Sequence, residues 1–208
     1  MKLQLKVCGL REPDNIEAIL QRVQPDYLGF IFYERSARYV GGKLPPFFAR
    51  QLDTVRKVGV FVDEKTARIA DVAGDYGLDV VQLHGNESPE ACAALQAQGL
   101  TVVKVFSVGA DFDFGRMAAY TPHVDAFLFD TPGKHPGGNG YPFDWDLLQQ
   151  YASERPFWLS GGIGPESLPH LQAFSHVRWQ VIDVNSRFEL NPGQKNVEML
   201  ESFVRAWK

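Results

Sequence analysis

The chain has 208 residues, a length that buries a sizeable core and is typical of one domain, which we expect to span residues 1–208. Its formal net charge is −4 and its lysines and arginines are scattered, so neither a nucleic acid nor an anionic membrane surface is expected as a partner. Lys2 and Lys6 interrupt the first apolar residues, no run of about 18 apolar residues occurs, and only two cysteines are present, so we expect a cytoplasmic protein without a signal peptide, a membrane span or a disulfide framework.

Short runs with strand-like alternation recur along the chain and are separated by runs with helical spacing. The expected strands are residues 3–8, 27–32, 57–62, 80–84, 102–106, 125–130, 157–160 and 180–184. The expected helices are residues 12–23, 65–75, 89–98, 143–151, 165–174 and 196–207. Pro13 suits a first helical turn, and Asn196 is a suitable N-cap for the last helix. Repeated β–α units of this kind predict an α/β fold with a parallel sheet.

The strands carry polar residues on one face, which decides between two α/β architectures. An open, doubly wound sheet has helices on both faces and favours nearly continuous apolar strands. Here Gln82 and His84 share one face of their strand, and we expect Lys57 and Lys104 to point inward on theirs. This pattern favours a single (β/α)8 TIM barrel, although the chain is small for that fold.

Four candidate functional residues lie at strand exits, which converge on one face of a barrel: Cys8, His84, Asp130 and Asp183. Cys8 is either a small buried hydrophobe or, beside Gly9, a functional thiol. Lys6 lies on the same face of the strand, about 6–7 Å away. A cation at that distance is expected to favour the thiolate, which can act as a base or nucleophile.

The other strand-exit residues each have a structural and a functional interpretation. Asp130 either caps a loop or helix, or is a carboxyl group in apolar surroundings that donates a proton. His84 is expected to position other groups rather than transfer protons. Asp183 either contacts a substrate or pairs with an inward lysine such as Lys6, because buried charges need partners.

Three loops add candidate binding residues. Arg38, in the second β–α loop, offers a fork for a carboxylate or phosphate, although an isolated arginine is more commonly a solvated surface residue. Residues 131–140 are either a mobile lid or a plain connection. Gly161 and Gly162 precede a helix after the seventh strand, where backbone N–H groups attract phosphate. No C-x-x-C or H-E-x-x-H spacing occurs, so no metal is expected.

Taken together, these segments resemble the phosphoribosylanthranilate isomerase family, over nearly the whole chain and in the expected order. The matching residues are Lys6–Leu10, Gly29–Phe32 with Ser36, Arg38 and Val40, Val58–Phe61, Gln82–Glu87, Asp130, Gly137–Gly140, Phe143–Trp145, Ser160–Ile163, Asp183 and Pro192–Lys195.

The resemblance implies a cofactor-free Amadori rearrangement of N-(5-phosphoribosyl)anthranilate, a phosphorylated small molecule, in tryptophan biosynthesis. It implies that Asp130 is the general acid, Cys8 the general base and Arg38 the residue that binds the anthranilate carboxylate. By the same resemblance, the substrate-binding residues include His84 and Asp183, and the phosphate-binding residues are Gly161, Gly162, Ser186 and Arg187.

Arg187 is the main departure from the family pattern, because it replaces a glycine whose backbone normally approaches phosphate. Its guanidinium is expected either to bind phosphate directly or to block the pocket. The alternative function is therefore a non-catalytic barrel that binds a phosphorylated ligand. Two related barrel enzymes fit less well, a sugar-phosphate isomerase with paired aspartates and indole-glycerol phosphate synthase, because the first strand ends in Cys8. The sequence leaves open whether the protein is a monomer or a homodimer.

Overall fold

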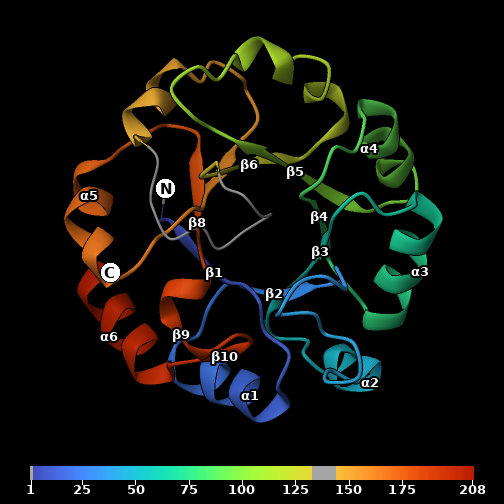
Figure 1. Ribbon diagram of the computed structural model, residues 1–208, viewed down its shortest axis with the longest axis vertical. Coiled ribbons are helices and arrows are strands. Elements are labelled where there is room, and N and C mark those ends of the chain that lie inside the picture. Colours follow the sequence, from blue (N-terminus) through green and yellow to red (C-terminus); the bar gives the residue numbers. More distant parts are fainter. Residues whose placement is uncertain (1, 133–143) are drawn as a thin grey trace.

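The computed structural model describes residues 2–132 and 144–208 and has a closed barrel of eight parallel strands inside a ring of helices (Figure 1). The strands of the barrel are β1 (Gln4–Val7), β2 (Tyr27–Ile31), β3 (Arg56–Phe61), β4 (Val80–Leu83), β5 (Thr101–Ser107), β6 (Ala126–Asp130), β7 (Phe157–Leu159) and β8 (Trp179–Val184). Each strand pairs with the next along the chain, and β8 pairs with β1. The expected (β/α)8 barrel is confirmed, and an open sheet is excluded.

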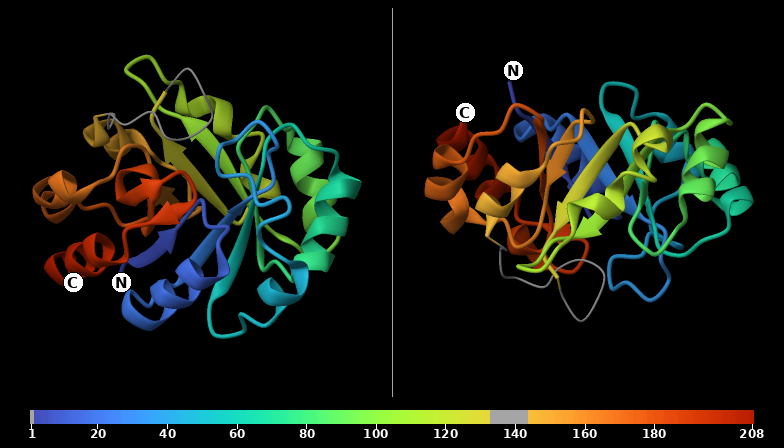
Figure 2. Two further views of the ribbon diagram at one scale, coloured as in Figure 1. Left: turned by 60° about the horizontal axis from the view of Figure 1, so that its bottom comes forward. Right: turned by 90° about the horizontal axis from the view of Figure 1, so that it is seen from above.

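Helices of unequal length cover the outside of the barrel (Figure 2). The α-helices are α1 (Pro13–Arg22), α2 (Pro46–Arg50), α3 (Thr66–Tyr76), α4 (Pro89–Gln96), α5 (Leu168–Ala173) and α6 (Val197–Trp207). The 3-10 helices are η1 (Phe114–Met117), η2 (Thr121–His123), η3 (Trp145–Gln150), η4 (Pro165–Ser167) and η5 (Ser186–Phe188). Within the described residues, no helix combines the length and the apolar character needed to cross a membrane.

Two expected helices differ from the structure. Of the helix expected at 143–151, the described part is the 3-10 helix η3, and Phe143 lies outside the described residues. The helix expected at 165–174 is divided into η4 and α5, and Pro169 lies in the first turn of α5. Proline has no N–H to donate, so it is tolerated in a first turn and starts a new helix here. The expected N-cap of α6 is confirmed, since the Asn196 side chain accepts a hydrogen bond from the Met199 N–H at 3.0 Å.

The barrel separates two apolar layers. The larger layer lies between the strands and the helices, and alternate strand residues such as Val81, Leu83 and Phe127 contribute to it. The smaller layer fills the barrel interior, where Tyr27 and Trp158 pack with their ring centroids 4.9 Å apart. The polar face expected for β4 therefore points inward.

The expectation that Lys57 and Lys104 point inward is wrong. Their neighbours Val58 and Val103 fill the barrel interior, so alternation turns both lysines outward toward the surrounding loops and helices. Lys104 Nζ lies 2.8 Å from the Gly85 carbonyl oxygen and 3.1 Å from Glu87 Oε2. Lysine is tolerated at these positions because each ammonium group finds oxygen acceptors outside the barrel wall.

A short antiparallel hairpin after β8 was not expected from the sequence. It consists of β9 (Glu189–Asn191) and β10 (Gln194–Lys195), with Gly193 in the left-handed region at φ +89° between them. The hairpin lies next to α1 (Figure 1), and the Asn15 side chain on α1 bonds both the N–H and the carbonyl oxygen of Lys195. The hairpin is thereby held beside the carboxyl ends of β1 and β8.

Candidate active site

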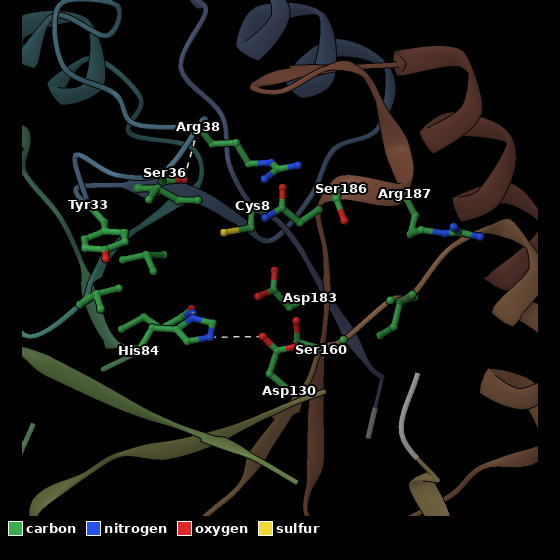
Figure 3. Close-up of a pocket in the computed structure, with 18 residues that line it drawn as sticks. Cys8, Tyr33, Ser36, Arg38, His84, Asp130, Ser160, Asp183, Ser186 and Arg187 are labelled. Atoms are coloured by element: carbon green, nitrogen blue, oxygen red, sulfur yellow. Dashed lines mark hydrogen bonds and ion pairs between the residues drawn. The ribbon is translucent and has the colours of Figure 1, made fainter. Parts of the chain in front are cut away.

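Side chains at the carboxyl ends of the strands line one pocket in the mouth of the barrel (Figure 3). The pocket unites the four strand-exit residues expected from the sequence, Cys8, His84, Asp130 and Asp183. The other expected site residues line it as well, namely Arg38, Gly161, Gly162, Ser186 and Arg187. The structure thus brings all nine sequence-based site residues together. Most of the segment expected to be a lid or a plain connection, residues 133–140, lies outside the described residues.

Cys8 is buried directly after β1, and its thiol points into the pocket (Figure 3). The neighbouring residue on β2 is Gly29, where a Cβ atom would lie 2.7 Å from Cys8 Sγ. Burial raises the pKa of the Cys8 thiol above its ordinary value, although Lys6 and Lys195 act to lower it. Lys6 thus acts in the expected direction and favours the thiolate, but desolvation of the buried thiol outweighs the nearby positive charge.

Lys6 is completely buried inside the barrel and has two polar partners there. Its Nζ lies 2.7 Å from Asp183 Oδ2 and 2.9 Å from Gln82 Oε1. Burial disfavours the charged form, but the charges of Asp183 and Cys8 outweigh this effect and raise the Lys6 pKa. The other oxygen, Asp183 Oδ1, is buried without a hydrogen-bond partner among the described residues. The pairing of Asp183 with Lys6 is confirmed, and its second oxygen can accept a hydrogen bond from a bound ligand.

Asp130, at the end of β6, has partners on both carboxylate oxygens. Its Oδ2 lies 3.2 Å from His84 Nε2, and its Oδ1 accepts a hydrogen bond from the Thr131 N–H at 2.8 Å. The dashed line in Figure 3 marks the contact with His84, which reaches across the pocket from the end of β4. Gly161 packs against this carboxyl group, since a Cβ atom there would lie 3.0 Å from Asp130 Oδ1 and 2.2 Å from Thr131 Oγ1.

Arg38 forms part of a charged cluster that sequence reasoning did not identify. Its guanidinium is paired with Glu189, and Glu189 Oε1 also accepts a hydrogen bond from Lys195 Nζ at 2.7 Å. Burial alone would raise the pKa of Glu189, but Arg38 and Lys195 hold it below its usual value. Burial lowers the pKa of Lys195 to about 8 despite the attraction of Glu189. Lys195 ends one of the segments that resemble the isomerase family, Pro192–Lys195, which is the signal that points to it, whereas Glu189 lies outside those segments.

The loops after β7 and β8 form the end of the pocket where phosphate was expected. Gly161 and Gly162 both adopt positive φ angles, +92° and +65°, which glycine reaches without strain. Arg187 has no such angle and is part of η5, so its side chain causes no backbone conflict. Its guanidinium is paired with Glu166 and points away from the centre of the pocket (Figure 3). In this conformation Arg187 does not fill the pocket.

The described residues contain no cluster of three or more histidine, cysteine, aspartate or glutamate side chains suited to a metal ion. The pocket instead combines a thiol, two carboxyl groups, a histidine and two arginines around a concave surface. Such a set can exchange protons with a bound ligand and hold anionic groups at its rim.

Comparison with known proteins identifies related chains. The model of the N-(5′-phosphoribosyl)anthranilate isomerase family matches residues 5–206. The chain is 43% identical to the N-(5′-phosphoribosyl)anthranilate isomerase of Phocaeicola vulgatus, over 98% of this chain and 97% of that protein.

Solved structures give the same result. The chain is similar to monomers of the dimeric phosphoribosylanthranilate isomerase from Thermotoga maritima, with a TM-score of 0.83, 31% identity and coverage of 99% of this chain and 98% of that one. It is also similar to a phosphoribosylanthranilate isomerase in complex with reduced 1-(o-carboxyphenylamino)-1-deoxyribulose 5-phosphate. Here the TM-score is 0.81 and the identity 32%, again over 99% of this chain and 98% of that one.

Proposed function

This chain belongs to the N-(5′-phosphoribosyl)anthranilate isomerase family and is an isomerase of tryptophan biosynthesis, and we propose that Cys8 is its general base and Asp130 its general acid. The observation that carries this assignment is that a thiol and a carboxyl group, at the ends of β1 and β6, line the same pocket. One proton donor and one proton acceptor are the groups that an aldose–ketose rearrangement needs.

The proposed reaction is an Amadori rearrangement in which protons move between the substrate, Asp130 and Cys8. Asp130 donates a proton to the ring oxygen as the bond between that oxygen and C1 breaks, which leaves a protonated Schiff base at C1. The Cys8 thiolate then removes the proton from C2, and the electrons of that C–H bond form the enolamine. The Cys8 thiol then returns a proton to C1 while the C2 hydroxyl gives its proton to the Asp130 carboxylate, which converts the enolamine to the aminoketose and restores both side chains. No electrons leave or enter the substrate, so the proposal includes no redox cofactor.

The base must be a thiolate, although burial raises the pKa of the Cys8 thiol. Lys6 and Lys195 both favour the charged form of Cys8, so two cations support the thiolate when it forms. The protonated Schiff base adds a third positive charge close to the thiol during the reaction. We therefore expect the thiolate to form in the presence of substrate rather than in the free enzyme.

We assign the remaining functional residues of the pocket to substrate binding. Arg38 binds the anthranilate carboxylate, and Asp183, whose Oδ1 is buried without a partner among the described residues, accepts a hydrogen bond from a sugar hydroxyl. His84 contacts both Asp130 and the substrate. The phosphate binds at the N–H groups of Gly161, Gly162 and Ser186, and Arg187 contributes its charge at the rim. We also propose that the protein is cytoplasmic and is either a monomer or a homodimer.

Turnover of freshly prepared phosphoribosylanthranilate, followed by fluorescence, tests the acid and base roles. We expect kcat to fall by about 10²–10⁴-fold in both Cys8→Ser and Asp130→Asn, because each variant loses one proton-transfer group. Ser107→Ala, at the end of β5, serves as a matched control because Ser107 does not line the pocket. Circular dichroism establishes that each variant is folded. Turnover within about threefold of wild type in either catalytic variant would contradict the assignment. A folded wild type without turnover would favour the non-catalytic binding barrel.

A further inference from the structure

A row of polar side chains crosses the barrel interior from Lys6 to Asp130. Lys6 Nζ lies 2.9 Å from Gln82 Oε1, and Gln82 Nε2 lies 3.3 Å from His84 Nδ1. His84 Nε2 lies 3.2 Å from Asp130 Oδ2. Lys6 and Gln82 are both almost completely buried, so these contacts form away from bulk water. The residues come from three different strands or strand exits, those of β1, β4 and β6.

The first contact fixes the orientation of the Gln82 amide. A lysine ammonium group has only donors, so the amide atom that faces Lys6 must be the carbonyl oxygen. The NH₂ group of Gln82 consequently faces His84 Nδ1. An amide nitrogen is a donor and has no acceptor capacity, so His84 Nδ1 must accept this hydrogen bond and carries no proton.

The same reasoning then determines which ring nitrogen of His84 carries the proton. A neutral imidazole has one protonated nitrogen, so an unprotonated Nδ1 leaves the proton on Nε2, which faces Asp130. An imidazolium would bring an Nδ1–H group against the Gln82 NH₂ group, two donors without an acceptor between them. Asp130 faces the ring at Nε2, and the Lys6 ammonium group lies behind Gln82. Asp183 and Cys8 also line the pocket around this ring.

We propose that Gln82 is a positioning residue that keeps His84 in the Nε2–H tautomer, so that His84 donates a hydrogen bond to Asp130. This inference rests on the proposed role of Asp130 as the general acid. A donor held at this oxygen stabilises the carboxylate that remains after Asp130 has given its proton to the substrate. Gln82 itself acts through His84, and Lys6 acts through Gln82.

A structural role for Gln82 alone predicts a different result from a tautomer-fixing role. If Gln82 only fills space and braces the barrel, an apolar residue of similar shape leaves the protonation pattern of His84 unchanged. If Gln82 fixes the tautomer, removing its NH₂ group releases His84, and replacing that group with an acceptor forces a proton onto Nδ1. The substitutions Gln82→Met and Gln82→Glu make these two changes with little change in side-chain length.

Nitrogen NMR of protein with ¹⁵N-labelled histidine measures this pattern directly and without substrate. The His84 signals are assigned by their loss in His84→Gln. In the wild type at neutral pH we expect an unprotonated Nδ1 and a protonated Nε2. In Gln82→Met we expect a mixture of both tautomers, and in Gln82→Glu a protonated Nδ1. The control Gln98→Glu makes the same chemical change in the exposed turn after α4 and is expected to leave the His84 signals unchanged.

The wild-type spectrum alone can overturn the proposal, if His84 carries a proton on Nδ1 at neutral pH. Unchanged His84 signals in folded Gln82→Met or Gln82→Glu would also overturn it. The kinetic expectation for Gln82→Met is a decrease in kcat of about tenfold with a smaller change in KM, comparable to the loss of one hydrogen bond. Because the spectrum needs no substrate, a failed tautomer prediction is distinguishable from a failed assignment of Asp130, which the Asp130→Asn kinetics report separately.

Discussion

Arg38 and Glu189 form a bidentate ion pair at the mouth of the barrel. Arg38 Nη2 lies 2.6 Å from Glu189 Oε2, and Arg38 Nε lies 2.9 Å from Oε1 and 3.0 Å from Oε2. The pair joins the loop after β2 to the hairpin after β8 and holds the arginine side chain at the edge of the pocket. Because Glu189 uses Nε and Nη2, a substrate carboxylate is expected to approach the guanidinium at Nη1.

Glu189→Gln is expected to raise KM by about tenfold while kcat changes by less than about threefold. A change of this size in KM corresponds to the loss of one charge-assisted contact with the substrate. Without the carboxylate, Arg38 and Lys195 are neighbouring cations, so the guanidinium moves out of its orientation. Steady-state kinetics measure the effect. The control is Glu201→Gln, which removes the carboxylate of an ion pair with Arg22 away from the pocket and should leave KM unchanged. An unchanged or lower KM in folded Glu189→Gln would show that Glu189 does not position Arg38.

Arg187→Gly is expected to raise KM by about fivefold with little change in kcat. The arginine side chain is 43% exposed, so its interaction with a phosphate is screened and is worth about 1 kcal/mol. Initial rates over a range of substrate concentrations measure the change, and their salt dependence should weaken in the variant. A large increase in activity would instead mean that Arg187 obstructs phosphate binding, as the non-catalytic alternative requires.

Gly29→Ala is expected to lower kcat by about 10²-fold, because the new methyl group would displace the Cys8 thiol from its reactive position. The matched control is Gly59→Ala on β3, where a Cβ atom would crowd Leu78 Cδ1 at 2.4 Å, on the outside of the barrel. That variant should lose about 1–3 kcal/mol of stability and retain its kcat. Equal kcat values for the two variants would mean that crowding at Gly29 has no specific effect on Cys8.

Lys195 gives the stability of the protein a defined pH dependence. Its folded-state pKa is about 8, whereas the ordinary value is 10.5. Between these values the unfolded chain binds a proton that the folded chain does not, so the free energy of unfolding rises with pH. Relative to Lys195→Met, the wild type should gain up to about 1.4 kcal/mol per pH unit in this range. Below pH 8 both states are protonated and the difference should be constant.

Urea unfolding at several pH values between 7 and 10.5 measures this difference. Lys43→Met is the control, because Lys43 is more than half exposed and its nearest acidic partner is 3.9 Å away. The control should follow the wild type throughout. If the free energies of unfolding of the wild type and Lys195→Met differ by a constant amount across the whole pH range, Lys195 has the same pKa in the folded and unfolded states.

The fold and the pocket residues were predictable because they depend on the alternation of side-chain direction along each strand and on the order of the strands. The polar residues at strand exits predicted where Cys8, His84 and Asp130 would meet, and the pocket contains all three. The directions of Lys57 and Lys104 were not predictable from their own strands. A valine follows the lysine in both strands, and valine fits the barrel interior as well as the outer layer.

The electrostatics of the site were less predictable than its residues. Strand spacing correctly placed Lys6 near Cys8, but the sign of the thiol's pKa shift depends on burial, which spacing does not give. The role of Glu189 depends on a hairpin too short to give a strand pattern in the sequence. Only the folded chain reveals that this hairpin brings an anion to Arg38.

The pairing of β1 with β8 also has a consequence for synthesis on the ribosome. Lys6 is synthesised 177 positions before Asp183, its ion-pair partner. Until β8 has left the exit tunnel, the nascent barrel lacks its last strand, and the Lys6 ammonium group has no carboxylate partner in the barrel interior. Productive closure of the barrel must therefore wait until β8 has been synthesised, however early the other strands are available.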